Sequence, residues 1–327
     1  MKSIVSLEIG GGIVRASELK NPFGSHPKIS KLTSFELPSS KGLESAVDSM
    51  EDLGASLKEL WEKEKFSTKT VALVVSGRRF VVREHDTGYA DLNALRKVIK
   101  LDAAGVIPEQ MVDPVVDFIP THHLELKGVA RTGGLLIASP SDPLKTLVGG
   151  CVRAGLHVEF IELAAIGLVR YVGSMTEDSN YIIVNAREQS TDIIAVYEGQ
   201  PRLVRVAPLG VPASGIFEGS DEIAGERPVV ANPLRRVERQ VLEGPLGDFI
   251  RGILATQRSQ EEKFSTEFSK LYFAGNGSTN GRLIGELSTA LKVKVEVLSC
   301  EQLGYQESGP LGHENLVSVA GAIGAKR

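Results

Sequence analysis

The chain has 327 residues, of which 42% are hydrophobic and 24% charged, a composition typical of globular proteins with a sizeable core. Its net charge of −4 leaves no basic surplus to neutralise phosphates, which argues against a nucleic-acid-binding protein. The two distant cysteines, Cys151 and Cys300, exclude a disulfide framework and a zinc site. The sequence shows neither a signal-peptide pattern nor an apolar run of membrane-spanning length, so we expect a cytoplasmic protein with no direct membrane span.

The first elements in chain order are two strands joined by glycines. Residues 3–9 and 13–19 read as strands, and Gly10–Gly12 between them predicts a tight hairpin. Residues 30–39 could add a short third strand to the same sheet. Apolar positions at helical spacing predict a helix over 42–64, and the β-branched run KTVALVVSG predicts a buried strand after it.

The sequence changes character from about residue 81. A charged helix is predicted over 91–103, and the strand-like segments VDPVVDFIPTHHLEL and RTGGLLIAS follow it. The next helix, in SPSDPLKTLVGGCVRAGL, is predicted to have a serine or aspartate cap and to stop at Gly155. HVEFIEL then reads as a strand, and 163–173 as a helix. One face of the first of these helices carries Leu92, Leu95, Val98 and Ile99.

The opening pattern returns after the polar linker SMTEDSN. NYIIVNAREQSTDIIAVYEGQPRLVRVAPLG predicts three strands, and KLYFAGNGSTNGRLIGELSTALKVKVEVLSC predicts strand, glycine-rich turn, helix and strand. Helices are expected at 236–242 and 246–258, and NLVSVAGAIGAKR is expected to form a buried closing helix. We therefore predict a duplicated α/β protein with lobes 1–178 and 179–327, whose ligand lies between them.

Glycines after a strand raise the question of a phosphate-binding loop. The P-loop string G-x-x-x-x-G-K-[ST] is absent. A dinucleotide fingerprint starting at Gly10 would have Arg15 in place of its last glycine, and IVRASEL alternates like a strand where that motif needs a helix. Two alternatives stay open: a plain tight hairpin, and a hairpin whose backbone N–H groups face phosphates.

The order of the motifs resembles the actin-like ATPase superfamily, and within it the PilM-type assembly proteins of type IV pili, relatives of the FtsA division proteins. The resemblance rests on SLEIGGGIVRASEL, LNALRKVIKLDAAGVIP, DFIP, AGLHVEFIEL, STDIIAVYEGQPRLVRVAPLG, AGNGS and NLVSVAGAIGAKR. It implies an actin-like, ribonuclease H-like duplicated fold with two lobes. It also implies an α+β subdomain inserted at about 81–155 and a reduced roof segment (2B-like) at about 211–260.

A nucleotide site with ATP and Mg²⁺ is the cofactor that the resemblance implies. For each contact the alternative is an ordinary turn or helix cap. The resemblance assigns no catalytic residue and no protein metal site. The implied nucleotide contacts are Glu8, Gly10, Gly11, Gly12, Ser190, Thr191, Gly275, Asn276, Gly277 and Ser278.

Three positions depart from the family pattern. Glu8 stands where an aspartate is expected, Asn185 replaces the second aspartate, and Arg187 replaces a glycine. Asparagine is a poor base, and the arginine adds bulk where phosphates would meet bare backbone, although its charge could pair with a phosphate. The stretch VPASGIFEGSDEIAGERPVVANPLRR, where the family has a small helical subdomain, also lacks clear helical periodicity. We therefore expect ATP binding to be weak, structural or lost, with little or no hydrolysis.

The resemblance further implies a scaffold of a type IV pilus or related secretion machine, held at the inner membrane through a partner. A PilN-like bitopic inner-membrane protein would dock its N-terminal tail as an extended peptide between the first and the inserted subdomains. Other components of the machine are further expected partners. The expected groove residues are Leu92, Leu95, Val98, Ile99, Ile107 and Pro108; the alternative for the helical stripe is plain core.

Two other functions stay open at this point. One is an active ATPase or small-molecule kinase of the same superfamily, against which Asn185 is the main observation. The other is an FtsA-like polymerising protein. The His122-His123 pair has no carboxylate or cysteine at ligand spacing, so a surface strand end is expected there rather than a metal site.

Overall fold

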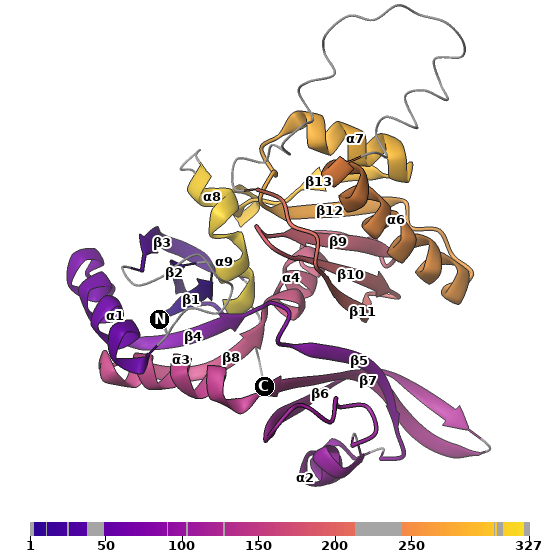
Figure 1. Ribbon diagram of the computed structural model, residues 1–327, viewed down its shortest axis with the longest axis horizontal. Helices are drawn as coiled ribbons and strands as arrows, with labels where there is room; N and C mark the ends of the chain where they lie inside the picture. Colours follow the sequence, from indigo (N-terminus) through magenta and orange to yellow (C-terminus); the bar gives the residue numbers. More distant parts are fainter. Residues whose placement is uncertain are drawn as a thin grey trace, which may run out of the picture.

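The computed structural model describes residues 3–10, 12–24, 26–37, 49–89, 91–102, 104–126, 128–212, 244–303, 305 and 310–323. Two five-stranded sheets lie side by side, and a three-stranded sheet projects from the first of them (Figure 1). The predicted contact Gly11 and the predicted helix 236–242 lie outside the described residues, as does most of the reduced roof segment.

The first sheet has the strand order β3-β2-β1-β4-β8, in which β1, β2 and β3 are antiparallel while β4 and β8 run parallel to β1. Helices α1 and α3 bury leucines such as Leu53 and Leu57 against one of its faces. The elements are β1 (Ser3–Gly10), β2 (Ile13–Lys20), β3 (Lys28–Glu36), α1 (Met50–Glu64), β4 (Thr70–Val75), α3 (Ser141–Arg153) and β8 (His157–Leu163).

The second sheet repeats this arrangement with the order β11-β10-β9-β12-β13 and the same strand directions. Helices α6 and α7 cover its outer face (Figure 1). The shared topology confirms the duplication predicted from the sequence. The elements are β9 (Tyr181–Ala186), β10 (Thr191–Tyr197), β11 (Gln200–Ala207), α6 (Gly244–Phe264), β12 (Lys270–Gly275), α7 (Gly281–Leu291) and β13 (Lys294–Val297).

Two helices fill the space between the sheets. α4 (Ala164–Gly173) and α9 (Leu316–Ala322) share one hydrophobic cluster with residues of both sheets. Every residue of α9 is buried, which confirms a buried closing helix. Two short helices, η2 (Cys300–Leu303) and α8 (Pro310–Glu314), precede α9 in the described part of the chain.

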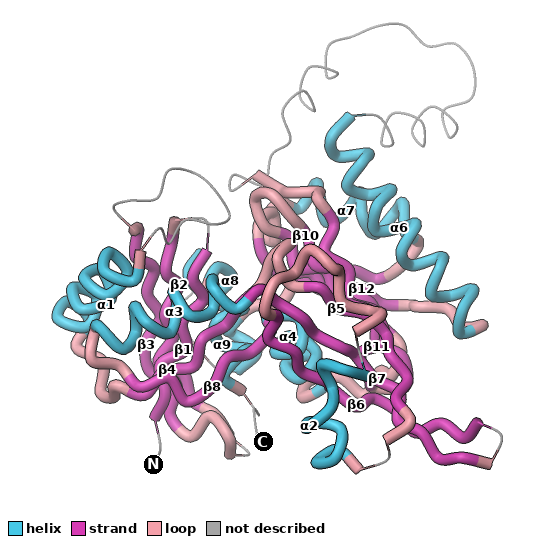
Figure 2. The backbone as a smooth tube through the Cα atoms, turned by 60° about the horizontal axis from the view of Figure 1, so that its bottom comes forward, coloured by secondary structure: helices cyan, strands magenta, loops and turns pink. Residues whose placement is uncertain are grey.

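The inserted subdomain is a three-stranded antiparallel sheet of order β5-β7-β6, with α2 packed on it (Figure 2). The strand β5 also contacts β11 of the second sheet, and Glu84 of β5 forms an ion pair with Lys263 of α6. The insertion therefore contacts both halves of the molecule. Its elements are β5 (Val81–Thr87), α2 (Leu92–Asp102), β6 (Pro114–Leu126) and β7 (Val129–Pro140).

Two helix boundaries differ from the predictions. Ser49 is extended and accepts a hydrogen bond from the backbone N–H of Asp52, so α1 begins at Met50 rather than near residue 42. α3 follows β7 directly, with Pro140 at its N-cap and no side-chain cap. The predicted serine or aspartate cap of α3 is therefore wrong, because Ser141 already lies inside the helix and its hydroxyl donates to Asp113 instead.

Candidate functional site

The two lobes contain equivalent hairpins. In the first lobe Glu8 of β1 lies opposite Arg15 of β2, and in the second lobe Asn185 of β9 lies opposite Asp192 of β10. Residues next to each of these four along the strands, such as Leu7 and Val184, belong to the hydrophobic clusters under the helices on the outer faces of the two sheets. Because side chains alternate along a strand, all four therefore point to the inner side of their sheets.

The same register matches Arg187 to Gly10. Each lies two residues beyond the first member of its pair, and the backbone N–H of Arg187 donates to Ser190 at the closing position of the second hairpin. A side chain that the first hairpin lacks therefore projects from the second one. The sequence departures at Asn185 and Arg187 thus lie within one small region.

A hydrogen-bonded network holds the second hairpin. The Arg187 Nη2 donates to the Asp192 Oδ1 at 2.9 Å and to the Ser190 Oγ at 2.9 Å. The Asn185 Nδ2 donates to the Asp192 Oδ2 at 3.2 Å. Both oxygens of Asp192, whose side chain is 3% exposed, are therefore engaged by groups of its own hairpin. Such charge-assisted bonds are stronger than neutral ones.

Glu8 is buried near the end of β1, on the inner side of the first sheet. Burial raises the pKa of its carboxyl group, while the guanidinium groups of Arg15 and Arg187 oppose that rise and Asp192 adds to it. Desolvation is the largest of these effects, so the charged form of Glu8 is disfavoured.

The other predicted contacts of the second lobe are engaged within the protein. Ser190 and Thr191 are buried, and the Thr191 hydroxyl donates to the carbonyl of Leu209. Asn276 donates from its backbone to Ala186 at 2.8 Å and from its side chain to Val211 at 2.9 Å. The glycine-rich turn therefore packs directly against the second hairpin.

Glycines are required in this turn for two reasons. Gly275 and Gly277 have φ values of 88° and 81°, in the left-handed region that side chains disfavour. A Cβ at Gly275 would also overlap the carbonyl oxygen of Ala186. Ser278 donates its N–H to Gly275 at 3.2 Å, and Asn280 caps α7. The structure thus brings all described nucleotide-contact candidates of the second lobe together around the hairpin.

A magnesium–nucleotide complex would need oxygen ligands from the two hairpins. Magnesium prefers oxygen ligands in strict octahedral geometry. Each carboxylate oxygen of Asp192 already accepts a hydrogen bond from its own hairpin. The Asn185 Oδ1 is buried without a partner among the described residues, but it is a single neutral oxygen that lies close to Gly275.

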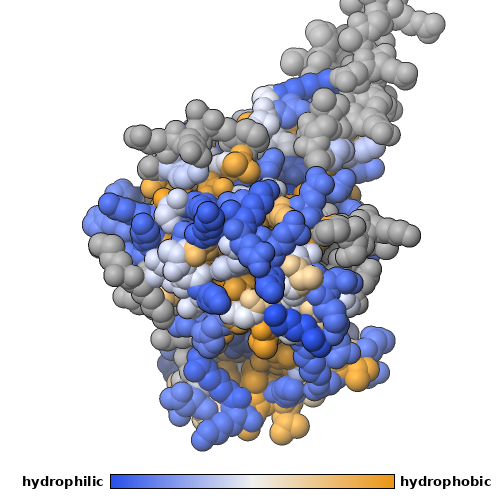
Figure 3. Space-filling view, turned by 90° about the vertical axis from the view of Figure 1, so that its left-hand side faces the viewer, coloured by the Kyte–Doolittle hydropathy of each residue, from blue (hydrophilic) through white to orange (hydrophobic). Residues whose placement is uncertain are grey.

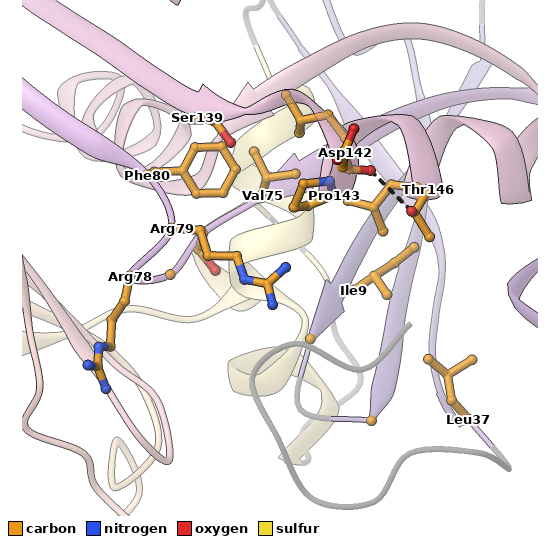
Figure 4. A pocket seen from close by; sticks show the side chains of 16 residues that line it. Ile9, Leu37, Val75, Arg78, Arg79, Phe80, Ser139, Asp142, Pro143 and Thr146 are labelled. Atoms are coloured by element: carbon orange, nitrogen blue, oxygen red, sulfur yellow. Dashed lines mark hydrogen bonds between the residues drawn. The ribbon is translucent and has the colours of Figure 1, made fainter. Parts of the chain in front are cut away.

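A pocket of about 280 Å³ opens beside the first hairpin (Figure 4). It lies between that hairpin, the connection from β4 to β5, and the first turns of α3. Its walls are mostly apolar, and Arg79 points into it while Arg78 points away (Figure 4). The lining includes Ile9, Gly10, Gly12, Leu37, Val75, Phe80, Pro143, Leu144 and Leu147.

The sequence did not single out this pocket, although Gly10 and Gly12 on its rim were candidates for another role. The pocket residues that the sequence analysis missed are in the segment RRF after KTVALVVSG and in α3. They were missed because the insertion brings these two segments together only in the folded protein. A basic pair directly after a buried strand was the available signal.

The six predicted groove residues are placed around α2 and the loop after it. Leu95 and Ile99 are 1% and 7% exposed and form the core of the inserted subdomain with Leu136. Val98, Ile107 and Pro108 are half-buried, and the side chain of Leu92 lies outside the described residues. Ile107 packs on this core. Among the described side chains, none of the six lines the pocket.

Other candidate features carry no site. His122 lies in the middle of β6 rather than at its end, which corrects the expected strand end, and burial lowers its pKa. The described residues contain no group of three or more metal-ligating side chains. Cys151 and Cys300 are buried free thiols whose pKa burial raises to about 12. No described helix is long and apolar enough to cross a bilayer.

Comparison with known structures identifies the fold. The structure is similar to a chain of the PilM-PilN type IV pilus biogenesis complex, with a TM-score of 0.75 and 19% identity, over 98% of this chain and 97% of that one. It is also similar to the ethanolamine utilization protein EutJ from Carboxydothermus hydrogenoformans, with a TM-score of 0.52 and 13% identity, over 99% and 90%. No protein-family model matches the chain, and no curated protein does. The chain has the actin-like α/β fold of PilM-type proteins.

Proposed function

We propose that this protein is a cytoplasmic adaptor of a type IV pilus or related secretion machine. It would bind the N-terminal cytoplasmic tail of a PilN-like inner-membrane protein, and this partner would hold it at the membrane. The single observation that carries the proposal is the apolar pocket between the first hairpin and the base of the insertion. The similar PilM–PilN complex supports this choice of partner.

The chemistry of the pocket suits a short extended peptide. Phe80 and Leu147 offer apolar surface for alternate side chains of such a peptide, and Arg79 offers a charged hydrogen-bond donor. The hairpin at Gly10 adds open backbone, since no atom of the described residues lies within 4 Å of where a Cβ would stand. A peptide bound here would contact the first hairpin, the connection from β4 to β5, and α3 at the same time.

The exposed face of α2 is the competing surface. Apolar side chains gather at the lower end of the face in Figure 3, on the side where the insertion lies in Figure 1. Leu101 and Val112 of the insertion are 80% and 81% exposed. The half-buried Val98 belongs to the groove predicted from the sequence. Peptide binding must therefore be tested on both surfaces.

The test is fluorescence anisotropy with a labelled synthetic peptide that has the tail sequence of a PilN-like protein from the same genome. Leu147→Asp is expected to weaken binding at least about tenfold, since hot-spot contacts are worth about 2 kcal/mol or more. Arg79→Ala should weaken binding more than Arg78→Ala, its neighbour that points away. Leu101→Asp, on the exposed end of α2, is the matched control and should bind like the wild type.

Two results would contradict the proposal. In the first, the peptide does not bind the wild-type protein although the protein is folded. The other is binding that survives Leu147→Asp but is lost in Val98→Asp, which would move the docking site to α2. Circular dichroism of each variant separates loss of binding from loss of folding.

A further inference from the structure

The inserted subdomain joins the first lobe through two connections, and both of them line the pocket. The first connection, residues 76–80 between β4 and β5, contributes all of its residues to the pocket wall. In the second connection β7 runs directly into α3, and Ser139 and Asp142 on either side of this junction also line the pocket (Figure 4). The position of the insertion relative to the first lobe therefore sets the shape of the pocket.

The insertion is in turn packed against the second lobe. All three of its strands contact β11. The buried Val82 of β5 and Leu135 of β7 belong to the same hydrophobic cluster as Val204 of β11. Beside this apolar contact, Glu84 of β5 forms the ion pair with Lys263 of α6, and these side chains are 37% and 43% exposed. The second lobe thus fixes where the insertion lies.

Phe80 connects the pocket wall to this contact. It lines the pocket, and it also packs against the cluster that contains Val82 and Val204. The connection bends at Gly77, whose φ of 110° lies in a region that side chains disfavour, and the Phe80 N–H donates to the Gly77 carbonyl at 3.2 Å. A shift of the insertion on β11 would therefore move Arg79 and Phe80 within the pocket.

We propose that the second lobe controls peptide affinity by positioning this wall, although the described residues that line the pocket all belong to the first lobe and the insertion. Val204 and the ion pair of Glu84 with Lys263 are positioning residues: they hold the insertion on β11, and the insertion holds Arg79 and Phe80 in place for the peptide. This inference rests on the proposed function, since it concerns the same peptide and the same pocket. A preorganised site binds more tightly because less ordering is needed on binding. Where only a fraction of the molecules has the wall in place, the apparent Kd rises in inverse proportion to that fraction.

The first test uses two neighbouring residues of β11 and the labelled tail peptide. Side chains of Val204 and Leu203 point to opposite faces of the strand, and Leu203 packs against the outer cluster of the second sheet. Val204→Ala is expected to weaken peptide binding about threefold or more. Leu203→Ala, which truncates the other face of the same strand, is the matched control and should bind like the wild type. Circular dichroism checks that both variants fold.

The ion pair provides a second test, which stays decisive if Val204→Ala does not fold. Glu84→Lys and Lys263→Glu each place like charges together at an exposed position, and each is expected to weaken binding about twofold. The double variant Glu84→Lys/Lys263→Glu restores an ion pair in the opposite sense and should recover the wild-type affinity. Such a recovery requires that the two lobes act on the pocket through their contact.

Hydrogen–deuterium exchange separates failure of this inference from failure of the proposed function. Because coupling is reciprocal, the peptide should slow exchange both at 76–80 and at 200–207 of β11. Protection of 76–80 without protection of 200–207 would overturn the inference and leave the docking pocket standing. Wild-type affinity in Val204→Ala, or in both single charge variants, would do the same. A peptide that does not protect 76–80 at all would contradict the proposed function and this inference with it.

Discussion

The two hairpins of this protein have the same topology and opposite surroundings. The first is open at Gly10 and borders the pocket beside the insertion. The second makes more contacts within its lobe, because the N–H of Val211 donates to Arg187 and that of Asn276 to Ala186, and Gly210 lies against Glu188, although the turn residues Glu188 and Gln189 themselves are exposed. One duplicated element thus borders a pocket in one lobe and is internally hydrogen-bonded in the other.

The two copies of this motif differ in how far their groups are engaged within the protein. In the second copy, hydrogen bonds and a buried ion pair engage Asn185, Arg187 and Asp192. In the first copy, glycines and an adjacent apolar pocket leave backbone and surface available. The stability of the fold should therefore respond strongly to changes in the second hairpin, and ligand binding to changes around the first.

The largest effect is expected from Asp192→Ala. This change removes the acceptor of both Arg187 and Asn185 and leaves a guanidinium group without its buried partner. We expect the free energy of unfolding to fall by about 3–5 kcal/mol, measured by chemical denaturation. The matched control is Asp248→Ala, which breaks an exposed pair with Arg251 on α6 and should change little. Equal losses in both variants would contradict the internally hydrogen-bonded second hairpin.

A glycine pair tests the packing of the hairpins. A Cβ at Gly210 would overlap the carbonyl oxygen of Glu188, so Gly210→Ala should cost about 1–3 kcal/mol of stability. Gly10→Ala adds a methyl group that would meet no atom of the described residues within 4 Å and should change stability by no more than about 0.5 kcal/mol. Denaturant midpoints of the two variants give the comparison, and a larger loss from Gly10→Ala would reverse it.

A smaller effect is expected from Thr191→Val, which gives the second hairpin the residue that Val14 supplies in the first. The lost hydroxyl leaves the carbonyl of Leu209 without this donor. The expected cost is about 1 kcal/mol, the usual value of a buried hydrogen bond. Thermal unfolding measures it, with Thr191→Ser as the control that retains the hydroxyl; if both variants lose equally, packing rather than the hydrogen bond holds this turn.

The smallest effect concerns Glu8 and depends on pH. Its pKa is raised above 4.5 in the folded state, so folded protein binds this proton more tightly than unfolded protein. Stability linked to this group is therefore present at low pH and decreases as pH rises through the folded pKa. Glu8→Gln removes that dependence. The Tm of this variant minus the Tm of the wild type should therefore increase as pH rises above 4.5. A Tm difference that is constant with pH would contradict the burial of the carboxyl group.

Most of the fold followed from local patterns in the sequence. Alternating residues identified the hairpins, helical spacing identified Leu53 and Leu57 of α1, and the repeated order of elements predicted two matching lobes. These features depend on short stretches of chain and on the period of their apolar residues. The predicted cap of α3 failed because β7 runs directly into that helix, which is a tertiary arrangement.

The candidate site was predicted less completely. Asn185 and Arg187 were recognised as departures, but their shared partner Asp192 depends on the register across the hairpin. The pocket combines Ile9, Arg79 and Leu147 from three distant segments, and no local period connects them. The stripe on α2 was read both as core and as groove, and burial places Leu95 and Ile99 in the core of the insertion.

Hydrogen–deuterium exchange of the wild-type protein with the PilN-like tail peptide tests the contrast between the hairpins most directly. The account predicts that the peptide slows exchange at residues 9–12, 76–80 and 142–147 and leaves 186–191 unchanged. Protection of 186–191 alone, or protection confined to α2, would contradict it.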